Sequence, residues 1–254
     1  MKTAPRVGGE GNCRPCHAPH YLERGPCTSC HRGDPGAARQ KLAHQRLISG
    51  RAAENGLPNG PAVVEGRERV ESLACRRCHL VGGAGNRLAT NLDHVVWKRD
   101  QGALARSIGE PVVNMPRFGL DVSQTEAVIA FLLRSAQPEL AEATYRVRFA
   151  HRDGLTRSIF DVRCGGCHRA LLADGPAGRG SAGPNLSGLF TREYPATAQG
   201  NRPWTPAQLK SWLQNPRALR PQTTMRPLRL EESEWHRLLE ELGAAGPSAR
   251  PVAP

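Results

Sequence analysis

The chain has 254 residues, of which 39% are hydrophobic and only 5% aromatic, a low share for a protein whose interior is built from side chains alone. The formal net charge is +12, but the arginines are scattered along the chain rather than gathered in one stripe, which argues against a nucleic-acid-binding protein. No run of eighteen apolar residues occurs, so no transmembrane segment is predicted.

Cysteine is used in a single repeated pattern. The sequence Cys-x-x-Cys-His occurs four times and uses all eight cysteines. Two thiols at this spacing can add to the two vinyl groups of a haem, and the adjacent imidazole then reaches the iron. We therefore predict four covalently attached haem c groups. The attachment residues are Cys13, Cys16, Cys27, Cys30, Cys75, Cys78, Cys164 and Cys167, and the iron ligands are His17, His31, His79 and His168.

Paired cysteines also occur in disulfide frameworks and in zinc sites with four cysteines. Neither alternative needs a histidine after every second cysteine, so the haem interpretation is favoured. Each haem carries two propionates, and four haems therefore lower the charge of the protein to about +4 to +8, depending on the iron oxidation state. Many arginines are then expected to pair with propionates, and nucleic acid is not an expected partner.

Residues 1–60 are predicted to form a small dihaem segment that ends in a linker. Two of the motifs lie within residues 13–50, a stretch that is too short to bury an ordinary core and must fold around its haems. No methionine occurs in this stretch, so the second axial ligands are expected to be His20 and His44. The alternative is that both are solvated surface histidines.

The pairing of these histidines follows from sequence distance. His20 comes three residues after His17 and cannot easily turn back to the same iron, so we assign it to the haem of His31. His44, in a predicted helix over residues 37–48, is then assigned to the haem of His17. The reverse pairing stays open. This stretch resembles the N-terminal part of multihaem cytochromes from metal- and oxyanion-respiring bacteria.

Residues 61–137 carry a different order of features. A predicted helix over residues 67–74 leads into the third motif, and a glycine-rich loop and Asn91-Leu92 follow it. Met115-Pro116 then precedes a closing helix from about Thr125 to Arg134, for which Ser123 is the predicted cap. This order resembles a class I cytochrome c domain. The resemblance implies that Met115 is the second ligand of the third haem, and a Met/His pair raises the reduction potential.

One position departs from that resemblance. Class I domains have a proline before the Asn-Leu pair, whose carbonyl accepts the ring proton of the haem histidine, and here Thr90 takes its place. That contact is left unassigned, although any backbone carbonyl would serve. His94 is expected to be a surface or helix-face residue because Met115 is available as the ligand.

After a connector at residues 138–153, which includes a short candidate strand at 145–149, the same plan repeats in residues 154–243. Its parts are a predicted helix over 156–162, the fourth motif, Pro184 before Asn-Leu, helices over 205–214 and 231–242, and Met225 between these two helices. Met225 is accordingly the expected second ligand of the fourth haem. His151 and His236 are expected at the surface, and residues 244–254 are expected to be disordered.

The predicted fold is mainly α, with short helices around four covalently bound haems: a small dihaem segment followed by two tandem cytochrome c-like domains. An iron with protein ligands on both faces offers no open position to a substrate, so we predict an electron carrier without catalytic residues. The alternatives are a terminal reductase or peroxidase with one open iron, and the subunit of a cytochrome filament. Expected partners are acidic or membrane-bound redox proteins. No leader is visible in residues 1–11, yet haem is attached outside the cytoplasm in the family resembled, so a periplasmic or cell-surface location is expected.

Overall fold

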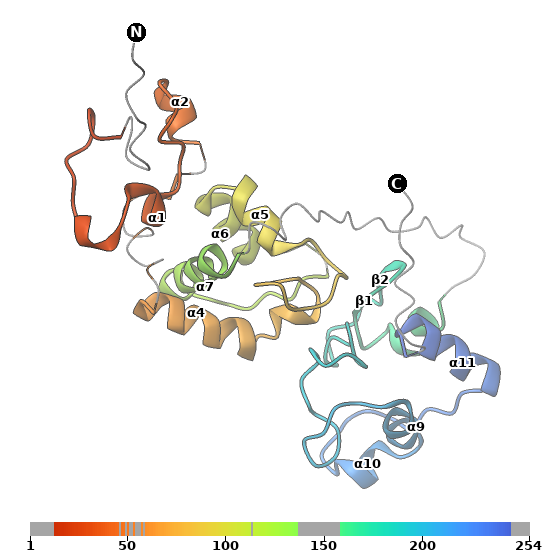
Figure 1. Ribbon diagram of the computed structural model, residues 1–254. Coiled ribbons are helices and arrows are strands. Elements are labelled where there is room, and N and C mark those ends of the chain that lie inside the picture. Colours follow the sequence, from red (N-terminus) through yellow and green to blue (C-terminus); the bar gives the residue numbers. More distant parts are fainter. Residues whose placement is uncertain are drawn as a thin grey trace. The chain divides into compact units, whose positions relative to one another are not determined.

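Figure 1 shows the computed structural model, which describes residues 13–45, 47–48, 50, 53, 57, 59–112, 114–136 and 158–244. The described part is mainly helical, with short helices. The chain divides into two compact units: unit 1 comprises residues 1–73, 92–111 and 117–144, and unit 2 comprises residues 74–91, 112–116 and 145–254. The candidate strand at 145–149, His151 and residues 245–254 of the predicted tail lie outside the described residues. None of the described helices is long and apolar enough to span a membrane.

The centre of unit 1 is helix α7, Val122–Ser135. All residues from Ala127 to Leu133 are buried, because α7 packs against three other helices. A helix that is apolar on every side belongs in a core, so α7 is the element around which this unit is built. The three helices that cover it are α4 (Pro61–Ser72), α5 (Leu92–Lys98) and α6 (Gln101–Gly109).

The start of α7 differs from the prediction. The Asp121 side chain accepts a hydrogen bond from the Gln124 backbone N–H at 2.8 Å, and the Gln124 side chain accepts one from the Asp121 N–H at 3.2 Å. This reciprocal capping box begins the helix at Val122, so the predicted cap at Ser123 is wrong. Aspartate and serine are both good caps, and two cap patterns overlap in this stretch.

Helices α4 and α7 meet at a glycine. A Cβ atom on Gly66 would lie 2.0 Å from the carbonyl oxygen of Ala127 and 2.8 Å from Cβ of Phe131. The two backbones therefore approach more closely than any larger residue allows. α4 begins at Pro61, six residues before the predicted helix, which places this glycine inside the helix rather than in front of it.

We expect Gly66→Ala to destabilise unit 1 by about 3 kcal/mol, because one of the two helices must move to admit the methyl group. Denaturation in guanidinium chloride, followed by far-ultraviolet circular dichroism, measures the change in the free energy of unfolding. Gly109→Ala is the matched control, since a Cβ on Gly109, at the end of α6, meets nothing within 4 Å. Equal midpoints for the two variants would refute the close helix crossing.

The N-terminal segment of unit 1 has little regular structure. It contains a 3-10 turn at Leu22–Arg24, α1 (Cys27–His31) and α2 (Gln40–Ala43). The helix predicted over residues 37–48 is thus reduced to a single turn, consistent with a stretch that has few apolar neighbours of its own. The exposed Leu42 and Leu47 show the same lack of a conventional core.

Arg32 connects this segment to the helices of unit 1 through three contacts. Its guanidinium lies 3.8 Å from the ring centroid of Trp97 and donates hydrogen bonds to the carbonyls of Val96, at 3.4 Å, and Leu133. Burial lowers the pKa of Arg32 to about 10, so it remains charged at neutral pH. The residue directly after the second Cys-x-x-Cys-His motif is therefore also the anchor of the segment.

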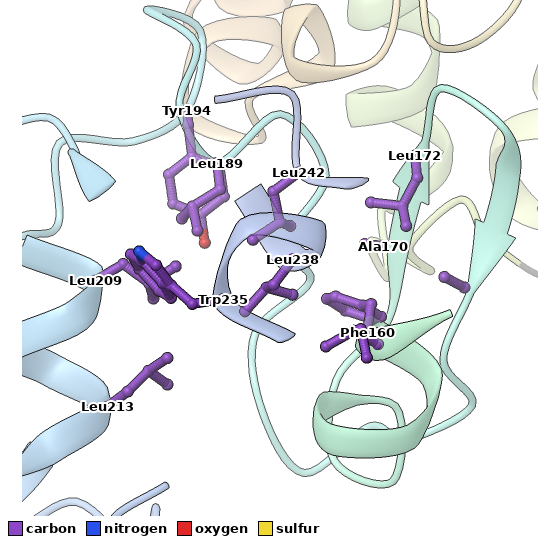
Figure 2. Close-up of a cluster of buried hydrophobic side chains, with 12 residues drawn as sticks. Phe160, Ala170, Leu172, Leu189, Tyr194, Leu209, Leu213, Trp235, Leu238 and Leu242 are labelled. Atoms are coloured by element: carbon purple, nitrogen blue, oxygen red, sulfur yellow. The ribbon is translucent and has the colours of Figure 1, made fainter. Parts of the chain in front are cut away.

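Unit 2 packs its helices around a separate core. The core contains residues from the turn Phe160–Cys164, from the antiparallel hairpin of β1 (Ala170–Leu172) and β2 (Gly175–Ala177), and from α9 (Pro206–Gln214) and α11 (Glu232–Glu241). Figure 2 shows Trp235 and Leu238 of α11 facing this cluster, with Phe160 beside Leu238. The short α10 (Pro216–Leu219) follows α9 directly.

A carboxylate ties the closing helix of unit 2 to the turn before the fourth motif. Glu241 accepts hydrogen bonds of 2.9 Å from the backbone N–H groups of Ile159 and Phe160 and from the Ser158 hydroxyl. Free N–H groups at the start of a helical turn favour such an anionic partner. This contact fixes the element that carries Cys164 against α11.

Candidate functional site

The Cys-x-x-Cys-His motifs share one local structure. In the first, third and fourth motifs, the carbonyl of the first cysteine accepts hydrogen bonds from the N–H groups of the second cysteine, at 3.1–3.2 Å, and of the histidine, at 2.9–3.0 Å. The second motif is itself the short helix α1. One helical turn brings positions three and four apart together on one side of the backbone, as attachment of a single macrocycle requires.

The cysteines of the motifs are not used to crosslink the chain. All eight lie in the described residues, and none of them is in a disulfide bond. The described residues also contain no cluster of three or more histidine, cysteine or acidic side chains of the kind a zinc site would use. Burial raises the pKa of the Cys75 and Cys164 thiols to about 11 and lowers the pKa of His79, which favours the neutral imidazole that binds metals.

The histidines of three of the motifs are oriented by backbone carbonyls. Nδ1 of His31 donates to the Ile48 carbonyl at 2.9 Å, Nδ1 of His79 to the Thr90 carbonyl at 2.7 Å, and Nδ1 of His168 to the Pro184 carbonyl at 2.8 Å. Such a contact fixes the tautomer and leaves Nε2 for the iron. Thr90 therefore fills the place of the expected proline, because its backbone carbonyl, and not its side chain, makes the contact.

The third and fourth motifs are followed by loops of the same design. A Cβ on Gly85 would lie 2.1 Å from the His79 carbonyl oxygen, and a Cβ on Gly178 would lie 2.1 Å from the His168 carbonyl oxygen. Both glycines have positive φ, at 127° and 74°. Two backbone hydrogen bonds close each loop at corresponding positions. In the third motif the Asn86 N–H donates to the Arg76 carbonyl and the Ala89 N–H to the Cys78 carbonyl. In the fourth motif the Arg179 N–H donates to the Gly165 carbonyl and the Gly183 N–H to the Cys167 carbonyl.

Gly183 allows the loop after the fourth motif to pack against the His168 ring. A Cβ at this position would lie 2.2–2.8 Å from three atoms of the His168 ring, so only glycine lets the backbone pass along the imidazole face. The repeated loop, with its glycines and its ring-to-carbonyl contact, gives the fourth motif the local structure of the third.

In the N-terminal segment the four histidines form two ring pairs. The ring centroids of His17 and His44 are 5.9 Å apart, and those of His20 and His31 are 5.6 Å apart. Two imidazoles bound to opposite sides of one metal, each at about 2.0 Å through a ring nitrogen, have centroids about 6 Å apart. The structure thus brings together the histidines that the sequence pairs.

Met225 contacts one tryptophan of unit 2, which in turn meets a second. The indole N–H of Trp212 donates to the Met225 sulfur at 3.0 Å, and the rings of Trp204 and Trp212 meet edge to face with centroids 6.1 Å apart. A cavity of about 190 Å³ is lined by both tryptophans and by Thr197, Gln199 and Arg220. Flat apolar walls and a guanidinium are of the kind that suit the edge and the propionates of a porphyrin, although neither Met225 nor the fourth motif lines this cavity.

Met115 lies in the same compact unit as the third motif. Residues 112–116 belong to unit 2 together with residues 74–91, which carry the third motif, although α5 and α6 separate the two stretches in sequence. The Met115 N–H donates to the Val112 carbonyl at 2.9 Å, which closes a turn at the methionine. The predicted ligand and its motif thus lie in the same unit.

The remaining described histidines have other surroundings. His236, exposed on α11, lies 3.7 Å from the Glu232 carboxylate one turn away. His94 is a half-buried residue of α5, in unit 1.

One family of known proteins matches part of the chain. Residues 61–132 match the family described as cytochrome c oxidase, cbb3-type, subunit III. No curated protein and no solved structure matches the chain. The matched stretch contains the third motif, the carbonyl-oriented His79 and Met115. Residues 61–132 are therefore a cytochrome c domain similar to the cbb3-type oxidase subunit III family, which implies haem c and electron transfer.

Proposed function

We propose that the chain is a tetrahaem c-type cytochrome that carries electrons between redox partners outside the cytoplasm. The four motifs would each attach one haem, which supplies one-electron redox chemistry. The single observation that carries the proposal is that each described motif has a candidate second ligand of the right type. His44 lies beside His17 and His20 beside His31, Met225 lies in the same unit as His168, and Met115 lies in the same unit as His79.

Ligand type would divide the haems into two classes. Two imidazoles favour ferric iron, whereas a thioether is a weaker donor and raises the reduction potential. The two bis-histidine haems would precede residue 50 and the two Met/His haems would follow residue 74. Electrons would then enter at the N-terminal segment from a strong donor and leave through the C-terminal domains. We place this transfer in anaerobic respiration of metals or oxyanions, and the basic surface suits acidic or membrane-bound partners.

The optical spectrum of the purified protein separates a carrier from a terminal reductase or peroxidase. With protein ligands on both faces of every iron, we expect a fully low-spin ferric spectrum and no binding of carbon monoxide to the ferrous protein. A high-spin ferric band in the untreated protein would show an open iron and would favour the enzymatic alternative.

A further inference from the structure

The third haem motif is bonded directly to the loop that orients the fourth haem histidine. The Asn86 side-chain amide donates to the Arg77 carbonyl at 2.9 Å and to the Thr191 hydroxyl at 2.9 Å. Arg77 lies between Cys75 and Cys78 of the third motif, whereas Thr191 follows Pro184, the carbonyl partner of His168, by seven residues. All of these residues belong to unit 2.

The Arg77 side chain makes a second set of contacts. Its Nη1 donates to the Asn185 carbonyl at 3.3 Å, and its guanidinium lies 5.3 Å from the ring centroid of Tyr194. The Tyr194 hydroxyl donates to the same Asn185 carbonyl at 3.3 Å. Asn185 is the neighbour of Pro184, so these bonds end one peptide from the group that orients His168.

The loop that Arg77 and Asn86 contact is itself held by a buried hydroxyl. Ser187, in this loop, is fully buried. The Ser187 hydroxyl donates to Asn185 Oδ1 at 2.6 Å and accepts from the Leu171 N–H at 2.7 Å. The neighbouring Gly188 is needed for this approach, because a Cβ there would lie 2.8 Å from the Asn86 amide nitrogen.

We propose that this contact is the electron-exchange junction between the third and fourth haem sites. It consists of Arg77, Cys78 and Asn86 on one side and of residues 184–191 on the other. A continuous path of covalent and hydrogen bonds runs from Cys78 through the adjacent Arg77 side chain to the Asn185 carbonyl, and from there through the backbone to the Pro184 carbonyl and the His168 ring. With haem bound at both sites, an electron moving along this path would reduce ferric iron at one site and leave ferric iron at the other, which would start as ferrous. The inference rests on the proposed function, since it requires both sites to hold haem.

The two arginines of the third motif supply a matched pair of variants. Arg77→Gln combined with Asn86→Ala removes the bonds across the junction. Arg76→Gln removes a charge from the adjacent position, whose Nε instead donates to the Val81 carbonyl within the third motif's own loop. Thr191→Val is a milder, nearly isosteric variant that removes the hydroxyl that Asn86 contacts.

Laser-flash photoreduction of the whole holoprotein follows the redistribution of electrons among its haems. We expect the double variant to slow the phase between the two methionine-ligated haems about tenfold, or ~1.4 kcal/mol, a loss typical of residues in one hydrogen-bond network. Thr191→Val should slow it less, and Arg76→Gln should leave it at the wild-type rate.

Optical and circular dichroism spectra of each variant provide the second readout and should remain those of a folded, fully low-spin protein. Wild-type exchange rates in a double variant with unchanged spectra would overturn the junction while leaving the electron carrier intact. Equal slowing by Arg76→Gln would also overturn it, because loss of charge would then be the cause. A high-spin spectrum in the wild-type protein would instead contradict the proposed function.

Discussion

Met225→His will lower the reduction potential of one haem by roughly 0.3 V, a fraction of the ~0.8 V that axial ligands span. Imidazole donates more strongly than a thioether and stabilises ferric iron, so the change is downward. The same substitution at Met115 will move a different haem in the same direction. Potentiometric titration measures both changes, and loss of one methionine-to-iron charge-transfer band accompanies each.

The size of the change at Met225 also depends on Trp212. The indole N–H draws electron density from the sulfur, which adds to the preference of this site for ferrous iron. Met1 lies outside the described residues, and Met115 and Met225 are the other methionines of the sequence. A titration in which neither variant shifts a potential would show that both methionine assignments are wrong.

His20→Ala and His44→Ala will each convert one low-spin haem to high-spin. The expected partners of these rings are His31, at 5.6 Å, and His17, at 5.9 Å. No other histidine is available within residues 13–50, so a lost imidazole has no protein replacement. Electron paramagnetic resonance of the ferric protein should show one high-spin haem per substitution. His236→Ala is the control, since its ring lies at the surface beside Glu232.

The pairing of the histidines has its own readout in the same series. In His20→Met the new thioether should become the ligand opposite His31, and nuclear Overhauser contacts of its methyl group to the haem attached at Cys27 and Cys30 would report it. A low-spin spectrum in both alanine variants would contradict the bis-histidine assignment. The ring centroid distances of 5.9 and 5.6 Å would then reflect ordinary aromatic contacts, which occur at such distances without a metal.

Some local structure was predictable because it is encoded in short sequence patterns. The helix predicted over 205–214 is present as α9, which begins one residue later, at Pro206, with Thr205 as its cap. The contact to Thr90 was left unassigned because a residue name says nothing about where its carbonyl points. The structure shows that the Thr90 carbonyl accepts a 2.7 Å hydrogen bond from His79 Nδ1, as the carbonyl of a proline would at this position.

Contacts between distant parts of the sequence were not predictable. Nothing in the sequence distinguishes Arg32 from the other arginines. Its contacts with Trp97 and Leu133 show that it connects the N-terminal segment to α5 and α7. Arg77 and Asn86 carry no pattern that identifies Asn185 and Thr191 as their partners. Such pairings depend on tertiary packing within each unit, which sequence periodicity does not report. The predicted domain boundaries at residues 61–137 and 154–243 stay predictions.

The mass of the intact protein tests the central claim most directly. The account predicts the mass of the polypeptide plus four covalently attached haems, with all eight cysteines consumed as thioethers and the haems retained after acid-acetone extraction. A mass equal to the polypeptide alone, with eight titratable thiols or with metal that a chelator removes, would contradict the account and favour zinc binding.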